Sequence, residues 1–278
     1  MVSSSVHAGI WGPVTATIDW CEANYQFSPF IAEMANSFSN LVTIFLGLYG
    51  GYVAWQQKLP NRYSLGFLSI AVVGIGSFAF HASLLYEAQL ADELPMVLAA
   101  SYSLFILSDA REGFKLDIGQ GVIPLIVFNI LFPISYAIYR NPVYHQAVFA
   151  TLMFFTVLRT VYLMRSDLSK NVPPAAKMKM SKMYKIGLLT FLTGFAVWNL
   201  DNIYCSALTE WKHAVGWPVA FLLEGHSWWH ALTAIGSYLM MLGTTCNSLS
   251  IKDSHTNFAI GWKLGLPRIQ RVAATKAE

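Results

Sequence analysis

Long apolar runs alternate with short polar segments along this chain of 278 residues. Seven runs predict helices, at residues 34–55, 63–85, 94–108, 121–139, 143–164, 186–204 and 217–244. Most of them reach the roughly 17–25 residues that a helix needs to cross the hydrocarbon core of a bilayer. The pattern predicts an all-α integral membrane bundle of seven transmembrane helices within residues 34–245. A polar segment, residues 1–33, precedes this bundle, and a polar tail that we expect to be flexible, residues 246–278, follows it.

The composition supports a membrane protein. Only 12% of the residues are charged and 55% are hydrophobic, whereas a soluble domain carries about 25% charged residues. The net charge of +3 is small, and no basic face of the kind that binds nucleic acid is apparent.

The distribution of basic residues predicts the orientation of the bundle. All but three of the eighteen lysines and arginines fall on the side that holds the 58–62 turn, the 109–120 and 165–185 loops and the C-terminal tail. The 165–185 loop contains two adjacent prolines and is expected to be irregular. Because cytosolic loops carry an excess of Lys and Arg, the N-terminus is predicted to be lumenal or extracellular and the C-terminus cytosolic.

Five polar residues interrupt the apolar runs at one predicted depth. Ser77 and His81 lie four residues apart in the second predicted helix, Asp92 follows it, and His226 and His230 lie four apart in the last. With the predicted orientation, all five fall in the outer half of the membrane. Any one of them alone is more simply a hydrogen-bonded packing residue, but their common depth favours a shared site.

Three histidines form a zinc site of the hydrolase type if the fourth position stays open for water or substrate. Zinc lowers the pKa of its bound water to about 7, which predicts attack by zinc hydroxide at neutral pH. Asp92 is then the candidate proton carrier, and Ser77 the candidate donor to the developing oxyanion. The other four histidines, among them His145, fall in predicted loops or termini and receive no role.

Asp19, Glu22, Asn24 and Glu33 offer oxygen ligands of the type that calcium prefers. On spacing alone, a solvated acidic loop is the simpler interpretation.

Two of the three cysteines, Cys21 and Cys205, fall on the predicted outer side and could form a disulfide there. Cys246 falls near the cytosolic end of the last predicted helix and is expected to be free.

Several local motifs carry a resemblance to a known family over residues 11–245. They are Trp11–Pro13, Ile18–Tyr25, Ile31–Glu33 with Asn36 and Asn40, Gly76–His81, Asp92–Met96 and Gly225–His230. In these motifs the sequence resembles the alkaline ceramidases, seven-span enzymes of a wider superfamily of membrane hydrolases that includes the adiponectin receptors. The block at residues 11–33 separates this family from the wider superfamily, which shares the three His, the Asp and the Ser.

The resemblance implies hydrolysis of the N-acyl bond of ceramides drawn from the bilayer, giving a sphingoid base and a fatty acid. It implies zinc at His81, His226 and His230, with Asp92 and Ser77 as catalytic residues. It also implies the Cys21–Cys205 disulfide and a location in the endoplasmic reticulum or Golgi. No obligate protein partner is evident from the sequence. The implied calcium ligands are Asp19, Trp20 through its carbonyl, Glu22, Asn24 and Glu33.

Two other classes of function are weighed against an enzyme. A seven-helix receptor of the adiponectin-receptor type would bind a lipid or protein ligand and use zinc structurally. A transporter is less favoured, because no repeated half and no pair of interrupted helices is visible in the sequence.

Overall fold

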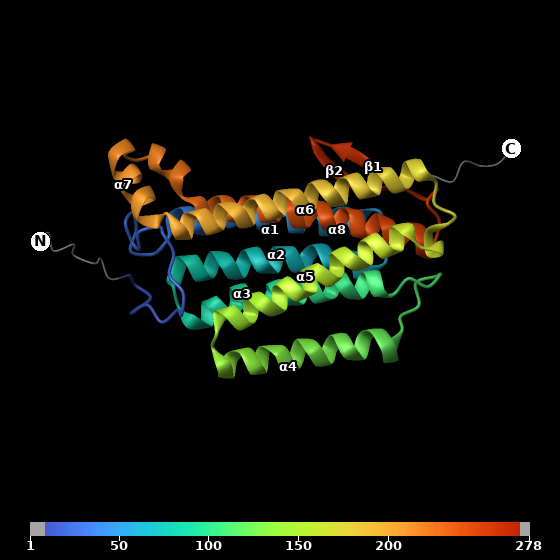
Figure 1. Cartoon of the computed structure of the whole chain (residues 1–278), viewed down its shortest axis with the longest axis horizontal. Helices are drawn as coiled ribbons and strands as arrows, with labels where there is room; N and C mark the ends of the chain where they lie inside the picture. Colours follow the sequence, from blue (N-terminus) through green and yellow to red (C-terminus); the bar gives the residue numbers. More distant parts are fainter. Residues whose placement is uncertain (1–8, 273–278) are drawn as a thin grey trace, which may run out of the picture.

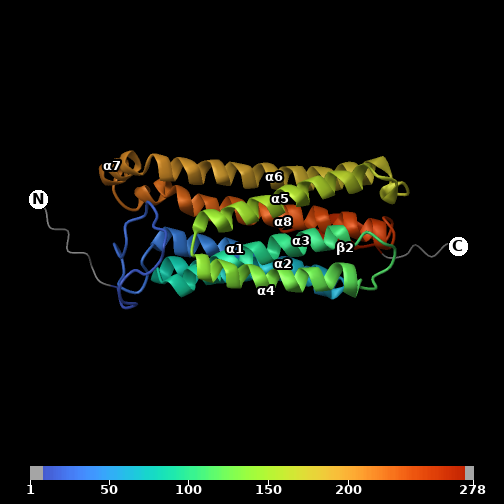
Figure 2. The same ribbon diagram turned by 60° about the horizontal axis from the view of Figure 1, so that its bottom comes forward.

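The structure, a computed structural model, describes residues 9–272 and consists of long helices packed side by side (Figure 1). The N-terminal segment and α7 lie at one end of the bundle, and the C-terminal hairpin lies toward the other (Figures 1 and 2). The helices are α1 Met34–Gln56, α2 Asn61–Ser83, α3 Tyr86–Ser108, α4 Ile123–Tyr139, α5 Pro142–Arg165, α6 Pro174–Ile203, α7 Cys205–Val215 and α8 Gly225–Lys252. Short helical turns at Ile118–Val122, Asp167–Ser169 and Val219–Leu223 and two strands, β1 Phe258–Lys263 and β2 Leu266–Arg271, complete the fold.

Within residues 9–272, six helices are long and apolar enough to cross a membrane: α1, α2, α3, the segment Ile118–Tyr139 that contains α4, α5 and α6. Many of their apolar side chains point outward, as Ile138 of α4 does with 78% of its surface exposed. These features identify a helical membrane protein. Helix α8, the predicted seventh span, has 28 residues and lies within the bundle, but polar residues such as Thr244, Thr245 and Asn247 lower its hydropathy.

Helix α8 packs along α6 and α1 and carries a large share of the buried core. Small residues allow α6 and α8 to approach closely. A Cβ atom on Gly187 would lie 2.7 Å from the carbonyl oxygen of Gly236. This close packing holds the N-terminal half of α8 against the neighbouring helices, where two of the predicted metal ligands lie.

Three predicted boundaries were wrong. The last predicted helix, 217–244, is α8 at Gly225–Lys252, and Val219–Leu223 forms a separate short turn before it. Helix α3 begins at Tyr86 rather than near residue 94, because polar residues of its first turns find partners at the end of the bundle: Gln89 contacts Thr17, and Glu93 accepts a hydrogen bond from Tyr136. Helix α6 begins at Pro174, so the second half of the segment expected to be irregular is helical. Its proline at the first helical position has the backbone φ angle that a helix requires.

The segment after α8 also differs from the flexible tail that we expected. Strands β1 and β2 form an antiparallel hairpin whose Phe258 and Ile269 side chains are buried in the main apolar core. The loop between them, Leu264–Gly265, has positive φ at both residues, as a two-residue hairpin turn requires. The hairpin is therefore a packed part of the fold.

Candidate metal centre

Three histidines from two helices meet at one end of the bundle. His81 comes from the last turn of α2, and His226 and His230 lie one turn apart at the start of α8. One ring nitrogen from each lies within 4.8 Å of the others, and all three side chains are buried. Among residues 9–272, no other group of three His, Cys, Asp or Glu side chains comes this close. Three buried imidazoles in this arrangement could hold a metal ion, and the donor set is compatible with zinc.

In two of these rings, one nitrogen, Nδ1, makes hydrogen bonds to neighbouring residues. His81 Nδ1 donates to the Glu33 carboxylate, and His230 Nδ1 lies 3.0 Å from the carbonyl oxygen of Asn36 and 2.8 Å from Ser39 Oγ. Metal-binding histidines usually donate their second N–H to a carboxylate or carbonyl in this way, which fixes the tautomer and leaves Nε2 free to ligate. His226 Nδ1 is buried without a hydrogen-bond partner among the described residues. The surroundings thus fit a metal-binding triad.

Ser77 lies one turn before His81 on α2, and the structure connects it to the same polar network. Its side chain is 2% exposed, and its Oγ accepts a hydrogen bond of 3.0 Å from Asn40 Nδ2. The Asn40 amide is also 3.2 Å from His230 Nδ1. Because Ser77 accepts this bond, its own hydroxyl hydrogen remains available to donate to another oxygen.

Asp92 is placed by the close packing of α3 on α2. A Cβ atom on Gly76 would clash with the carbonyl oxygen of Ala91, and it would lie 3.0 Å from the backbone nitrogen of Asp92. Only a glycine lets the two helices approach so closely at this point. The residue before Ser77 thereby sets the distance between the α2 backbone and the backbone of Asp92.

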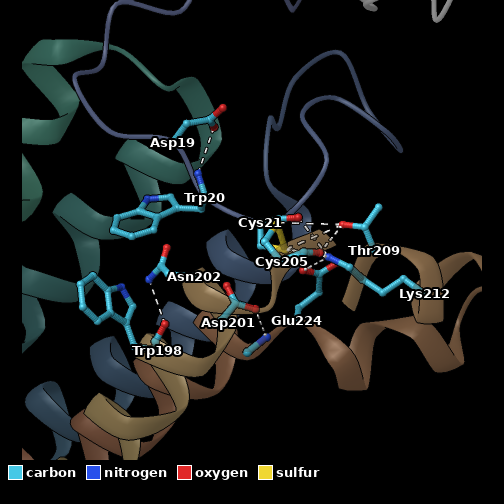
Figure 3. Close-up of a disulfide and its surroundings, with 11 residues drawn as sticks. Asp19, Trp20, Cys21, Trp198, Asp201, Asn202, Cys205, Thr209, Lys212 and Glu224 are labelled. Carbon is cyan, nitrogen blue, oxygen red and sulfur yellow. Dashed lines mark hydrogen bonds and ion pairs between the residues drawn. A yellow bond between two sulfur atoms is a disulfide. The ribbon is translucent and has the colours of Figure 1, made fainter. Parts of the chain in front are cut away.

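The Trp20 indole covers the histidines from the side of the N-terminal segment. Its ring centroid is 4.1 Å from that of His226 and 5.8 Å from that of Trp198. Figure 3 shows Trp20 between the N-terminal segment and Trp198 of α6. This aromatic cover limits the access of water to the histidines on that side.

The five predicted calcium ligands lie on the N-terminal segment, but the structure does not bring their carboxylates into one tight group. Both Glu22 oxygens accept backbone N–H groups at the start of α1, from Ala35 and Asn36 at 2.7 and 2.8 Å. Asp19 is exposed and accepts the Trp20 backbone N–H at 3.0 Å. Glu33 Oε1 and Asn24 Oδ1 are buried without a partner among the described residues.

A cavity of about 300 Å³ adjoins these residues and is lined in part by Asp19, Glu22, Asn24, Lys212 and Glu224. Burial raises the pKa of Glu22 to about 8 and that of Glu224 to about 7. Burial also raises the pKa of Glu33 well above its usual range. Each shift reflects mainly the cost of burying an ionised carboxylate, with a smaller contribution from neighbouring carboxylates, and a cation bound among them would offset that cost.

The predicted disulfide is confirmed: Cys21 is bonded to Cys205 at the start of α7, with their Cα atoms 5.4 Å apart. Figure 3 shows Lys212 of α7 reaching back to the same point. Its Nζ donates to the Cys21 carbonyl and to Glu224 Oε2, each at 3.0 Å. The disulfide and this buried ion pair together fasten the N-terminal segment to the start of α8. Cys246 is buried and free, as predicted.

Several residues that orient the site received no role from the sequence. They are Asn36, Ser39, Asn40, Lys212 and Glu224, which contact the histidines or fasten their segments. A signal was present for α1, because Glu33, Asn36, Ser37 and Asn40 recur at a spacing of three or four residues and are all buried. His145, expected in a loop, is a buried residue of α5 whose Nε2 lies 2.8 Å from the carbonyl oxygen of Glu93.

Comparison with known proteins gives a consistent picture. The family model described as Ceramidase matches residues 12–272. The chain is 34% identical over 235 residues to alkaline ceramidase 3 of Mus musculus, covering 84% of each chain. It is 32% identical over 270 residues to alkaline ceramidase YPC1 of Saccharomyces cerevisiae, covering 92% of this chain and 84% of the yeast protein. An alkaline ceramidase of Arabidopsis thaliana is 30% identical over 233 residues, 83% of each chain.

Proposed function

Because the chain belongs to the ceramidase family, we propose that it hydrolyses the N-acyl bond of ceramides, giving a sphingoid base and a free fatty acid. The observation that supports this most directly is the buried triad of His81, His226 and His230 with its oriented ring nitrogens. The amide of a ceramide lies close to the bilayer surface, and the triad lies at one end of an apolar bundle. A receptor with structural zinc is not favoured, since the relatives are named as hydrolytic enzymes.

We propose zinc as the metal, held by the Nε2 atoms of the three histidines. Zinc bound there would polarise the amide carbonyl and lower the pKa of a water molecule, which is the chemistry that amide hydrolysis at neutral pH needs. Glu33 and Asn36 keep His81 and His230 in the tautomers that present Nε2 to the ion.

Ser77 and Asp92 supply the proton chemistry in this proposal. The Ser77 hydroxyl donates a hydrogen bond to the carbonyl oxygen of the substrate as negative charge develops on it. Asp92 accepts a proton from the attacking water and delivers it to the amine nitrogen as the carbon–nitrogen bond breaks. The Asn40 amide supports the role of the serine, because it donates to Ser77 Oγ and holds the hydroxyl in place.

We further propose a calcium site formed by Asp19, the Trp20 carbonyl, Glu22, Asn24 and Glu33. The unpartnered oxygens of Glu33 and Asn24 support it. Glu33 would then serve both ions, with Oε1 toward calcium and Oε2 on the imidazole of His81. Calcium would act on the reaction indirectly, by ordering the N-terminal segment beside the histidines.

For the topology, we propose that α8 is a seventh span and that the N-terminus is lumenal and the C-terminus cytosolic. The positions of the N-terminal segment and the C-terminal hairpin toward opposite ends of the bundle are compatible with an odd number of spans (Figure 1). The family suggests the endoplasmic reticulum or Golgi as the compartment.

The proposal is tested by measuring fatty acid released from a ceramide by purified protein in detergent, before and after zinc is removed and restored. We expect zinc removal, His81→Ala and Asp92→Ala each to abolish measurable turnover, and zinc to restore only the unsubstituted protein. Full activity of the His81→Ala protein would contradict the zinc mechanism. An absence of ceramide turnover by the zinc-loaded protein would contradict the proposed reaction itself.

A further inference from the structure

The hairpin β1–β2 runs along the side of the bundle rather than away from its end (Figure 1). At its open end, the backbone nitrogen of Arg271 donates to Gln57 Oε1 at 2.8 Å, just beyond the C-terminal end of α1. Nearer its turn, the carbonyl oxygen of Pro267 accepts a hydrogen bond from the hydroxyl of Tyr238, in the middle of α8. The turn of the hairpin therefore lies nearer the middle of the bundle than its open end does.

The tip of the hairpin exposes large apolar side chains. Leu264 in the turn is 93% exposed, and Trp262 at the end of β1 is 63% exposed. Lys263 between them is also exposed. This tip makes no contribution to the buried core, so its apolar surface requires another explanation.

Two neighbouring helices mark the level at which the membrane surface crosses this end of the bundle. On α1, the outward-facing aromatic residues Tyr52 and Trp55 are 55% and 70% exposed, and such residues gather at the boundary between lipid and water. On α6, the exposed Lys185 is followed directly by Ile186, which begins an outward-facing apolar stretch. Lysine residues are also common at the edge of the surface that a membrane protein exposes to lipid.

Contacts with α8 show that these two marks lie at the same level. Helices α1 and α8 run in the same direction, with Ser39 beside His230 and Tyr49 beside Tyr238. Each residue of α1 thus lies level with the residue of α8 that comes about 190 positions later in the sequence. Tyr52 therefore lies at about the level of residue 242 of α8. A Cβ atom on Gly243 would lie 3.1 Å from Tyr184 Cβ, which places Lys185 of α6 at the same level.

Tyr238 lies four residues before that level on α8, which is about 6 Å deeper at 1.5 Å per residue. Pro267 binds Tyr238 and pairs with Trp262 across the hairpin, so both lie at that depth, and the Leu264 turn extends further in. We propose that the hairpin tip is inserted in the leaflet at this end of the bundle, with Trp262 just below the interface and Leu264 among the lipid acyl chains.

The charges around the tip suit this position. The stem of Lys263 is long enough, at about 6 Å, for its ammonium group to reach back to the lipid phosphates. Arg271, which is exposed at the open end of the hairpin, adds positive charge there, which favours anionic lipids. The inserted hairpin therefore anchors the C-terminal segment to the bilayer, independently of the metal centre and of the reaction.

The test is the environment of a fluorophore attached to Leu264→Cys in the full chain. The protein is placed in nanodiscs of phosphatidylcholine containing one quarter phosphatidylserine, and an NBD label is quenched either by iodide in water or by lipids spin-labelled near the top of the acyl chain. Thr256→Cys, at an exposed position between α8 and β1, is the matched control. The unsubstituted chain gives the background from the buried Cys246.

We expect the Leu264 label to be quenched several-fold more by the spin-labelled lipid than by iodide, and the Thr256 label to show the reverse. Equal access of iodide to both labels would overturn the proposal. Protection of the Leu264 label from both quenchers would overturn it as well, because it would indicate a protein partner instead of lipid. Lys263→Cys gives the same comparison if the Leu264 variant cannot be purified in folded form.

Discussion

The carboxylate of Glu33, at the start of α1, accepts a hydrogen bond from Nδ1 of His81, at the end of α2. Both side chains are almost fully buried. The bond determines which nitrogen of His81 faces the other two histidines, and it joins the N-terminal segment to the candidate metal centre. A residue of the proposed calcium site is thus also a direct neighbour of a proposed zinc ligand.

The first prediction concerns this bond. Glu33→Gln removes the charge that favours the Nδ1–H tautomer of His81, and loss of such a partner lowers metal affinity by about 10–100-fold. We expect the purified variant to lose zinc at a chelator concentration that the unsubstituted protein tolerates, as measured by elemental analysis after dialysis. Glu87→Gln, at an exposed position in the first turn of α3, should retain zinc. Unchanged zinc retention by Glu33→Gln would show that the bond does not support the metal.

Ser77 and His81 are one turn apart on α2 but have different proposed roles, which predicts different losses. His81→Ala should remove zinc and activity together. Ser77→Ala should keep a full zinc content while kcat falls about 100–1,000-fold, the usual cost of losing one donor to an oxyanion. Zinc content and single-turnover rates separate the two effects. Loss of zinc from Ser77→Ala would contradict the assigned role of the serine.

The three histidines of the candidate metal centre were predictable because their signals are local and the topology brings them together. The i, i+4 pair His226 and His230 identifies one helix face, and the lysine distribution places His81 at the same depth. The start of α3 and the oriented rings were not predictable in this way. They depend on partners far away in the sequence, such as Tyr136 for Glu93 and the Asn36 carbonyl for His230.

The C-terminal hairpin escaped the sequence analysis for a different reason. In a sequence, a two-residue turn of this kind is usually recognised by Asn-Gly or Asp-Gly, because both residues need positive φ. Here the turn is Leu264-Gly265, with φ values of 51° and 77°. A leucine in that conformation gives no recognisable turn signal, and a proline and three basic residues obscure the alternating pattern of the flanking strands.

The next prediction concerns the close contact of α2 and α3. Gly76→Ala places a methyl group against the Ala91 carbonyl, so the helices must separate next to Ser77 and Asp92. Overpacking of this kind costs about 1–3 kcal/mol, and we expect a lower Tm and a lower kcat. Gly119→Ala, at the other end of the bundle, meets only Asp117 at 3.9 Å and serves as the control. A Gly76→Ala protein with unchanged Tm and kcat would show that the close contact is not needed.

The buried pair of Lys212 and Glu224 leads to a prediction about stability. Lys212→Met leaves Glu224, whose side chain is 2% exposed, as a buried carboxylate without its partner. Removal of one member of such a pair costs about 3–5 kcal/mol. Thermal unfolding should therefore occur at a clearly lower temperature in Lys212→Met. The double variant Lys212→Met/Glu224→Gln should recover most of the loss, whereas equal losses in both variants would mean that the charge of Glu224 is not the cause.

The last prediction concerns calcium. A cation that binds only the folded protein stabilises it by about 2.7 kcal/mol at 100 times its Kd, which corresponds to roughly 5–10 °C in Tm for a chain of this size. We expect calcium to raise the Tm of the zinc-loaded protein by this amount, and Asp19→Asn to remove most of the response. Asp167→Asn, an exposed change at the opposite end of the bundle, should keep it. An Asp19→Asn protein that still responds fully to calcium would place the ion elsewhere and leave residues 19–33 as an acidic segment held by its own hydrogen bonds.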